Sequence, residues 1–337
     1  MNNIAKYGSL ATHRAFLGRP PKRGVIAPFR CSAKAVFERQ VKGLVTRLGA
    51  IGCERVVIGI SGGLDSTLAL LVAVEAFDRM KLPRKQIFAI GMPGFGTSVR
   101  TKSNSTVLCG ELGVTFELIP IVRTARQHLK DIGHDGVTCD ITYENAQARI
   151  RTLILMDKAN LVGGIVLGTG DMSEIALGWC TYNGDHMSMF GVNNGVPKTI
   201  VRKVCGWWAA TRPEGACARA VRDIVDTPVS PELKKGQVTE DTIGPYELHD
   251  FFLWNFIMNE MGPGDLLIEA DRYFNARGER FSLDVIRRTL AIFLRRFFTQ
   301  AFKRNCQPDG IRVFPFELSL HGWWIPSCLG QPRRFRV

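Results

Sequence analysis

The sequence has 337 residues, 45% hydrophobic and 22% charged, proportions that indicate a globular protein of one large domain with an appendage. No apolar run reaches the roughly 18 residues of a membrane helix, and the nine cysteines include no C-x-x-C pair, which argues against a membrane protein, a zinc site and a disulfide framework and favours a reducing, cytoplasmic location. The formal net charge of +13 favours polyanionic ligands, either nucleic acid or phosphate-rich nucleotides.

Residues 1–30 are basic and contain three prolines, which predicts a linker or N-terminal extension. A transit peptide is the alternative, because the first acidic residue is Glu38. Apolar residues then recur with helical spacing from about residue 33 to residue 49, which predicts the first helix.

Short apolar runs alternate with helical segments in the next part of the chain. The predicted strands occupy residues 55–60, 86–92, 114–122 and 164–168. The predicted helices between them occupy about 66–80, 97–113 and 143–161. Strands that alternate with helices in this way predict an α/β fold, a doubly wound parallel sheet with helices on both faces.

The C-terminal part of the chain has a different pattern. Residues 213–244 are rich in Pro, Gly, Lys and Asp, which predicts a mobile loop. Helices predicted at about 246–261 and 283–303 form a C-terminal helical extension. We therefore expect a linker over 1–30, a main domain over 31–306 and an irregular tail over 307–337.

The heptapeptide SGGLDST, residues 61–67, lies between a predicted strand and a predicted helix. Its glycines permit a tight turn, and the helix N-terminus that follows offers free amides to an anion. Asp65 would repel a bare phosphate, so its position predicts a magnesium ion between carboxylate and phosphate. The absence of a lysine excludes a Walker A loop. The alternative is a tight turn in which Asp65 or Ser66 only caps the helix.

Other segments add polar side chains at defined spacings. Asn145 and Arg149 are four residues apart and share one helix face, although an exposed polar face would look the same. Asp171 and Glu174 have the spacing of a capping box, in which Glu174 either closes the box or binds metal. Lys198 follows a proline that favours a helix start, where a cation is unfavourable unless an anionic ligand is present. A solvated lysine is the alternative.

Together these segments closely resemble the synthetase domain of glutamine-dependent NAD synthetases, which belongs to the PP-loop ATP pyrophosphatase superfamily. The resemblance extends from about residue 25 to about residue 320. The matching motifs are SGGLDST, MPGFGT, GHD, TYENAQAR, LGTGDMSE, ALGWCTYNGDHMS, VPKT, DTPVSPEL and GPYELHDFF. The resemblance implies a carbon–nitrogen ligase that converts deamido-NAD to NAD through an NAD-adenylate, with ATP cleaved to AMP and pyrophosphate.

Carried over by position, the resemblance also implies the site residues. The ATP contacts would be Gly59, Ile60, Ser61, Gly62, Gly63, Leu64, Asp65, Ser66, Thr169, Lys198 and Ser230. The deamido-NAD contacts would be Asn145, Arg149, Trp179, Cys180, Thr181, Tyr182 and Lys303. The magnesium ligands would be Asp65 and Glu174, and these two residues would share the catalytic role with Lys198.

The resemblance further implies a homodimer, because deamido-NAD lies at a subunit interface in this family. Glutamine-dependent members carry a large N-terminal glutaminase, and only about 50 residues precede the first predicted strand, too few for such a domain. We therefore expect ammonia to be used directly or supplied by a separate glutaminase subunit.

Two other functions remain open at this stage. One is a truncated, non-catalytic paralogue that binds nucleotides. The other is a PP-loop enzyme that acts on tRNA, which the net charge favours, whereas the absence of paired cysteines disfavours a thiolating enzyme. Nucleic acid is not expected as the partner of the favoured synthetase.

Overall fold

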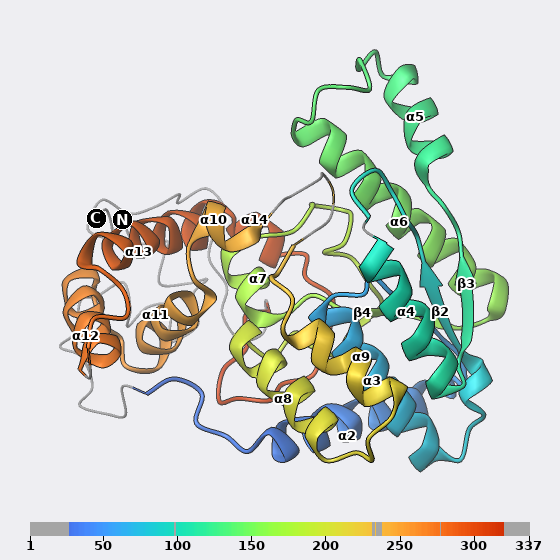
Figure 1. Ribbon diagram of the computed structural model, residues 1–337, viewed down its shortest axis with the longest axis horizontal. Coiled ribbons are helices and arrows are strands. Elements are labelled where there is room, and N and C mark those ends of the chain that lie inside the picture. The colour runs from blue at the N-terminus through green and yellow to red at the C-terminus, as the bar shows by residue number, and fades with distance from the viewer. Residues whose placement is uncertain (1–26, 98, 231–232, 234–237, 277, 320–337) are drawn as a thin grey trace, which may run out of the picture.

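A parallel sheet forms the centre of the protein, whose computed structural model describes residues 27–97, 99–230, 233, 238–276 and 278–319 (Figure 1). The sheet has five strands in the order β3-β2-β1-β4-β5, and all neighbouring pairs are parallel. The strands are β1 (Val56–Gly59), β2 (Ile87–Gly91), β3 (Thr115–Leu118), β4 (Ile165–Gly168) and β5 (Phe190–Gly191). Strand order reverses between β1 and β4, which is the place where ligands bind in open α/β sheets.

Helices cover both faces of this sheet, as predicted (Figure 1). One face packs against α6 (Ile141–Val162), which also contacts α5 (Val122–Asp131). The other face packs against α3 (Leu64–Met80) and α4 (Val99–Leu112). The outer layer on that side is formed by α2 (Ala33–Ile51), α8 (Lys198–Ala210) and α9 (Ala216–Val225).

Alternate residues of each strand point into two separate cores. Val57 belongs to the smaller core beneath α6, whereas its neighbours Val56 and Ile58 belong to the larger core beneath α3. All three are fully buried. A strand that is buried on both faces needs a continuous apolar run, and residues 56–58 provide one.

Two sequence predictions were wrong in this part of the chain. The strand predicted at 114–122 ends at Leu118, and α5 begins at Val122. The loop predicted at 213–244 contains α9 and a short helix, α10 (Thr239–Ile243). The second error arose because the prediction rested on the overall Pro, Gly, Lys and Asp content of the segment, whereas Ala218, Val221 and Ile224 recur with helical spacing and are buried on one face of α9.

The C-terminal helices form a second body of packed helices beside the sheet (Figure 1). They are α11 (Tyr246–Met258), α12 (Pro263–Asn275), α13 (Leu283–Thr299) and α14 (Ala301–Arg304). This confirms the helical extension, although α12 was not predicted. Buried phenylalanines of α11 and α13 hold it together, with ring centroids of Phe256 and Phe297 5.4 Å apart. None of the described helices is long and apolar enough to cross a membrane.

The described segment after α14, residues 305–319, forms no helix, yet it packs into the core. Val313 and Phe314 are buried, and Arg39 of α2 donates a 2.6 Å hydrogen bond to the carbonyl of Val313. Phe29 packs edge-on against Phe314, with centroids 4.9 Å apart. Gly310 forms a parallel bridge with Gly191 at the end of β5. The linker prediction for 1–26 and the tail prediction for 320–337 lie outside the described residues.

Candidate active site

The SGGLDST segment forms a tight turn between β1 and α3. Gly62 has a φ of 80°, a left-handed conformation that favours glycine. Gly63 is the N-cap of α3, and no side chain caps this helix, so the alternative in which Asp65 or Ser66 only caps it was wrong. Ser61 Oγ accepts from the Gly63 amide at 3.2 Å and lies 3.1 Å from Ser66 Oγ. The helix start therefore keeps amides free for a ligand.

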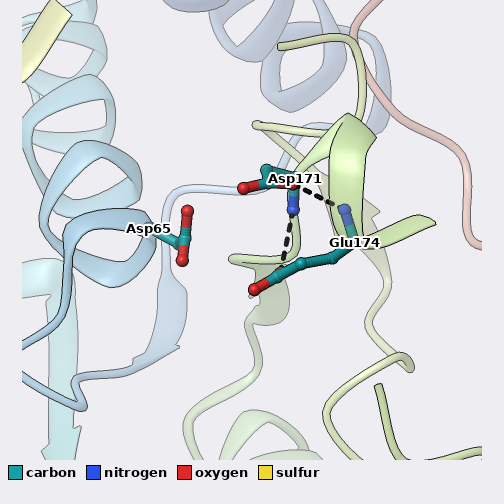
Figure 2. Close-up of side chains that lie close together, drawn as sticks. All are labelled: Asp65, Asp171 and Glu174. Atoms are coloured by element: carbon teal, nitrogen blue, oxygen red, sulfur yellow. Dashed lines mark hydrogen bonds between the residues drawn. The ribbon is translucent and has the colours of Figure 1, made fainter. Parts of the chain in front are cut away.

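Three carboxylates meet in front of this turn (Figure 2). Asp65 lies in the first turn of α3, and Asp171 and Glu174 lie at the start of α7 (Met172–Leu177). One carboxylate oxygen from each lies within 4.8 Å of the other two. Asp171 and Glu174 form the predicted capping box, and Glu174 also faces the cluster. The capping-box alternative for Glu174 is therefore confirmed, and its binding of metal stays a prediction.

Lys198 neutralises part of this negative charge. It is the first residue of α8 and is 2% exposed, so the solvated-lysine alternative was wrong. Its Nζ lies 2.6 Å from Asp65 Oδ2, 2.8 Å from Asp171 Oδ2 and 2.9 Å from Glu174 Oε1. Burial by itself lowers the pKa of Lys198, but the three carboxylates outweigh burial and hold that pKa well above its usual value.

Burial also shifts the pKa values of two of the carboxylates. Burial raises the pKa of Glu174 to about 7, against the opposing effect of the Lys198 ammonium. Burial also raises the pKa of Asp171 well above its usual range. Asp65 Oδ1 is buried and has no hydrogen-bond partner among the described residues. Carboxylate oxygens are the ligands that magnesium prefers, and Asp65 Oδ1 is available to accept one more contact. The group therefore fits a magnesium ion, which Asp65 and Glu174 would hold.

Asn193 was not predicted from the sequence, and it joins two parts of this site. Its Nδ2 donates to the carbonyls of Asp65 and Thr169, both at 2.9 Å. Its Oδ1 accepts from Gln40 Nε2 of α2 at 3.0 Å. Asn193 is fully buried, so it fixes the start of α3 relative to the end of β4. The only sequence signal was a pair of asparagines between apolar residues.

The residues predicted to contact deamido-NAD lie close together. Thr181 Oγ1 donates to Asn145 Oδ1 at 2.8 Å, and Arg149 Nε donates to the Tyr182 carbonyl at 3.3 Å. Lys303 Nζ donates to the Cys180 carbonyl at 2.6 Å. Asn145 and Arg149, which share one face of α6, therefore both bond to the segment of residues 181–182. Its assignment to deamido-NAD stays a prediction.

The end of α7 is held by cations from the helical extension. Arg296 Nε donates to the Leu177 carbonyl at 2.9 Å, and Arg304 Nη1 donates to the Ala176 carbonyl at 2.9 Å. Lys303 Nζ also donates to the Gly178 carbonyl at 2.9 Å. These carbonyls have no partner within the helix, and cations are favourable at that end of the dipole. The extension thereby fixes the position of residues 178–182.

A cavity lies between the carboxylate cluster and this predicted substrate segment. Its polar lining includes Glu174, Cys180, Asp185, His186, Ser188, Asn194, Lys303 and Arg304. Asp185 accepts from the Thr181 amide at 2.8 Å, and burial raises its pKa. The cavity therefore connects charged groups at the start of α7 with those held at its end.

Ser230 lies in the connection between α9 and α10, apart from the residues above in sequence. The Leu233 carbonyl of the same connection accepts from Gln147 Nε2 of α6 at 3.0 Å, so this segment reaches α6. The assignment of Ser230 to ATP stays a prediction.

Comparisons with known proteins agree with this geometry. The model of a protein family described as NAD synthase matches residues 36–272. The chain is similar to the glutamine-dependent NAD(+) synthetase of Mycobacterium leprae, with 43% identity over 319 residues, 86% of this chain and 47% of that protein. The chain thus spans about half the length of the curated relatives it matches.

Solved structures show the same fold. The crystal structure of a glutamine-dependent NAD(+) synthetase from Cytophaga hutchinsonii superposes with a TM-score of 0.71 at 16% identity, over 87% of this chain and 53% of that one. An NMN synthetase from Francisella tularensis superposes with a TM-score of 0.58 at 23% identity, over 75% of this chain and 99% of that one.

Proposed function

Because this chain belongs to the NAD synthase family, we propose that it uses ATP to amidate deamido-NAD to NAD. The observation that carries the proposal is the junction of an uncapped helix start, three carboxylates and a buried lysine, beside a cavity that Glu174, Cys180 and Lys303 help to line. The free amides of the helix start and the lysine ammonium would bind a phosphate chain. The carboxylates would bind a magnesium ion.

The proposed reaction has two steps. A carboxylate oxygen of the nicotinate attacks the α-phosphorus of ATP, and the bond to pyrophosphate breaks, which gives an NAD-adenylate. Ammonia then attacks the acyl carbon, the bond to AMP breaks, and the nitrogen loses a proton. The first step brings two anions together, so positive charge must be in place before reaction.

Each part of the site has a role in this scheme. The amides and hydroxyls of residues 59–66, with Thr169 and Ser230, would bind ATP. Lys198 would turn its ammonium toward the phosphates as negative charge moves onto pyrophosphate. Asp65 and Glu174 would hold magnesium, which supplies further neutralisation of that charge. The cluster of Asn145, Arg149, residues 179–182 and Lys303 would bind deamido-NAD.

The nitrogen donor and the assembly are also part of the proposal. Ammonia would be used directly or delivered by a glutaminase partner, and the active form would be a homodimer in the cytoplasm. Exposed apolar side chains on α6 support the dimer, because Leu153 is 58% exposed and Leu161 is 79% exposed. Arg149 lies on the same face, four residues before Leu153, so the proposed substrate contact would lie at the subunit interface.

The test is an assay of the purified 337-residue chain with magnesium, ATP and deamido-NAD, with ammonium or glutamine as nitrogen donor. We expect NAD and AMP in equal amounts with ammonium and no NAD with glutamine. A parallel reaction with nicotinate mononucleotide distinguishes the dinucleotide substrate from the mononucleotide. ATP binding without any product would support the non-catalytic paralogue, and tRNA-dependent AMP release would support the tRNA enzyme.

Asp65→Asn tests the metal ligand within this scheme. The amide keeps the side-chain volume but loses the charge that holds the ion, so we expect pyrophosphate release to fall by about a hundredfold or more. Asp78→Asn is the matched control, since Asp78 lies on the same helix and pairs with Arg84 at the surface. Equal rates and equal magnesium dependence in both variants would remove Asp65 from the site.

A further inference from the structure

Asp250 of α11 is a buried carboxylate that contacts the start of α8. It is 1% exposed. Its Oδ2 accepts from the backbone amide of Thr199 at 3.0 Å and from Thr199 Oγ1 at 2.6 Å. Its Oδ1 accepts from Ser173 Oγ of α7. Ser173 Oγ in turn accepts from the backbone amide of Lys198 at 2.8 Å.

These contacts replace a helix cap. The N-cap position of α8 is Pro197, which offers no side-chain cap. The first amides of a helix have no partner within it, and leaving them unpaired in a buried place is costly. Here the first two amides, of Lys198 and Thr199, are paired by side chains from α7 and α11. Asp250 is 51 residues away from Thr199 in sequence, so α8 is capped by a different element.

The same face of α11 also contacts the Lys198 side chain. Tyr246 lies one helical turn before Asp250, and its ring centroid is 5.2 Å from Lys198 Nζ. Tyr246 is buried, and its hydroxyl has no hydrogen-bond partner among the described residues. One helix of the extension thus bonds Thr199 directly and Lys198 through Ser173, and places an aromatic ring beside the Lys198 ammonium.

We propose that Asp250 is a positioning residue for the ligase reaction, acting on Lys198 through the first turn of α8. This inference rests on the proposed function, in which the Lys198 ammonium meets the phosphates of ATP. A displacement of about 1 Å in a group that stabilises the transition state can cost about a hundredfold in rate. The hydrogen bonds of Asp250 in the described part of the chain go to Ser173 and Thr199 and not to residues 178–182, so we expect the loss in kcat and an unchanged KM for deamido-NAD.

Asp250→Asn is the main test, because the amide keeps the shape but presents a donor to groups that also donate. The control is His249→Leu, which changes the next buried residue. His249 Nε2 bonds to the Ile243 carbonyl at 2.8 Å, and no hydrogen bond of His249 among the described residues reaches α8. We expect kcat to fall tenfold to a hundredfold in Asp250→Asn and to stay at the wild-type value in folded His249→Leu.

Hydrogen exchange at peptides covering residues 196–201 gives a readout that needs no turnover. We expect faster exchange there in Asp250→Asn and wild-type exchange in His249→Leu. If the wild type makes no NAD, the proposed function fails while the exchange experiment still tests the cap. Lower turnover with unchanged exchange would overturn the route through α8.

A double-mutant cycle separates positioning from a general loss of structure. In a Lys198→Met background, Asp250→Asn should cost no further turnover, because the group that it positions is gone. Full additivity of the two losses would overturn the proposal. If Asp250→Asn does not fold, Thr199→Val removes one of the hydrogen bonds to Asp250 and should lower kcat severalfold with normal deamido-NAD KM. Unchanged kcat in that variant would also overturn it.

Discussion

Lys198 and a magnesium ion would compete for the same carboxylates. Its ammonium lies within 2.9 Å of one oxygen from each of Asp65, Asp171 and Glu174. An ion bound by the same oxygens would meet a positive charge at close range, which is unfavourable in a buried site. We therefore infer that magnesium enters together with ATP, whose phosphates give the ammonium a new partner.

Lys198→Met tests this exchange. The change leaves the buried Asp171 and the half-buried Asp65 and Glu174 without their cation, so we expect the nucleotide-free variant to lose about 3 kcal/mol of unfolding free energy. Manganese without nucleotide should restore part of that loss and should not stabilise the wild type. Melting curves with and without manganese check both statements. Equal metal protection of the two proteins would contradict the exchange. A surface lysine would have predicted a small gain in stability instead.

His249 gives a pH-dependent contribution to stability. Burial lowers the pKa of this histidine to about 4, so the folded protein keeps it neutral while the unfolded chain takes up a proton near pH 6.5. Stability is therefore fully present above pH 6.5 and is lost as pH falls toward 4. Between pH 7 and pH 5 this loss amounts to about 2 kcal/mol.

His249→Leu should remove that part of the pH dependence. Chemical unfolding of wild type and variant at pH 7 and pH 5 measures it, and the difference between the two proteins cancels the other titrating groups. We expect the variant to lose about 2 kcal/mol less than the wild type over this interval. Parallel loss in both proteins would show that residue 249 does not titrate with folding.

At the scale of elements, α7 is short but is held at both ends. Its N-terminus carries the capping box of Asp171 and Glu174, and its C-terminus receives Arg296 and Arg304 from the extension. Negative groups at the start and positive groups at the end both favour the helix dipole. The parts of the site proposed to bind metal and substrate therefore lie at opposite ends of one short helix.

Gly178→Ala tests the C-terminal end of α7. Gly178 is the C-cap with a φ of 56°, and an added Cβ would collide with the Gln300 side chain. We expect a loss of more than about 1 kcal/mol in stability and a raised KM for deamido-NAD, because residues 178–182 must shift. Gly163→Ala is the matched control, since Gly163 caps α6 with a φ of 66° and its nearest described neighbour lies 3.6 Å away. The control should lose about 1 kcal/mol and keep its KM. Equal KM values in both variants would contradict the link.

Sequence patterns predicted the elements whose stabilising contacts join residues that are close together along the chain. The SGGLDST turn, the capping box and the helix start at Lys198 were confirmed, because each depends on neighbours along the chain. Asn193 and Asp250 could not be found this way, since their partners lie 128 and 51 residues away. Predicting the burial of Lys198 also needed the fold, because the carboxylates that surround it come from two other helices.

At the scale of the whole molecule, the exposed face of α6 tests the proposed dimer. Arg149, Leu153, Asp157 and Leu161 follow one another at four-residue spacing and are exposed. Leu153→Glu combined with Leu161→Glu should give a monomer with an unchanged melting temperature and a raised KM for deamido-NAD. Analytical ultracentrifugation checks the mass. Val285→Glu is the control, because Val285 is exposed at 39% on α13 instead. A wild-type monomer with full activity would contradict the dimer.

The bridge between Gly191 and Gly310 also affects the order in which the chain can fold during synthesis. Gly191 donates to the Asp309 carbonyl at 2.7 Å and accepts from the Ile311 amide at 3.1 Å. Asn193, two residues after Gly191, donates to the Asp65 carbonyl, so residues 309–311 bond the end of the strand that precedes this contact with α3. On the ribosome, folding of the sheet therefore runs ahead of completion of the site. Until residue 311 has been synthesised, Gly191 of β5 lacks its hydrogen bonds to Asp309 and Ile311.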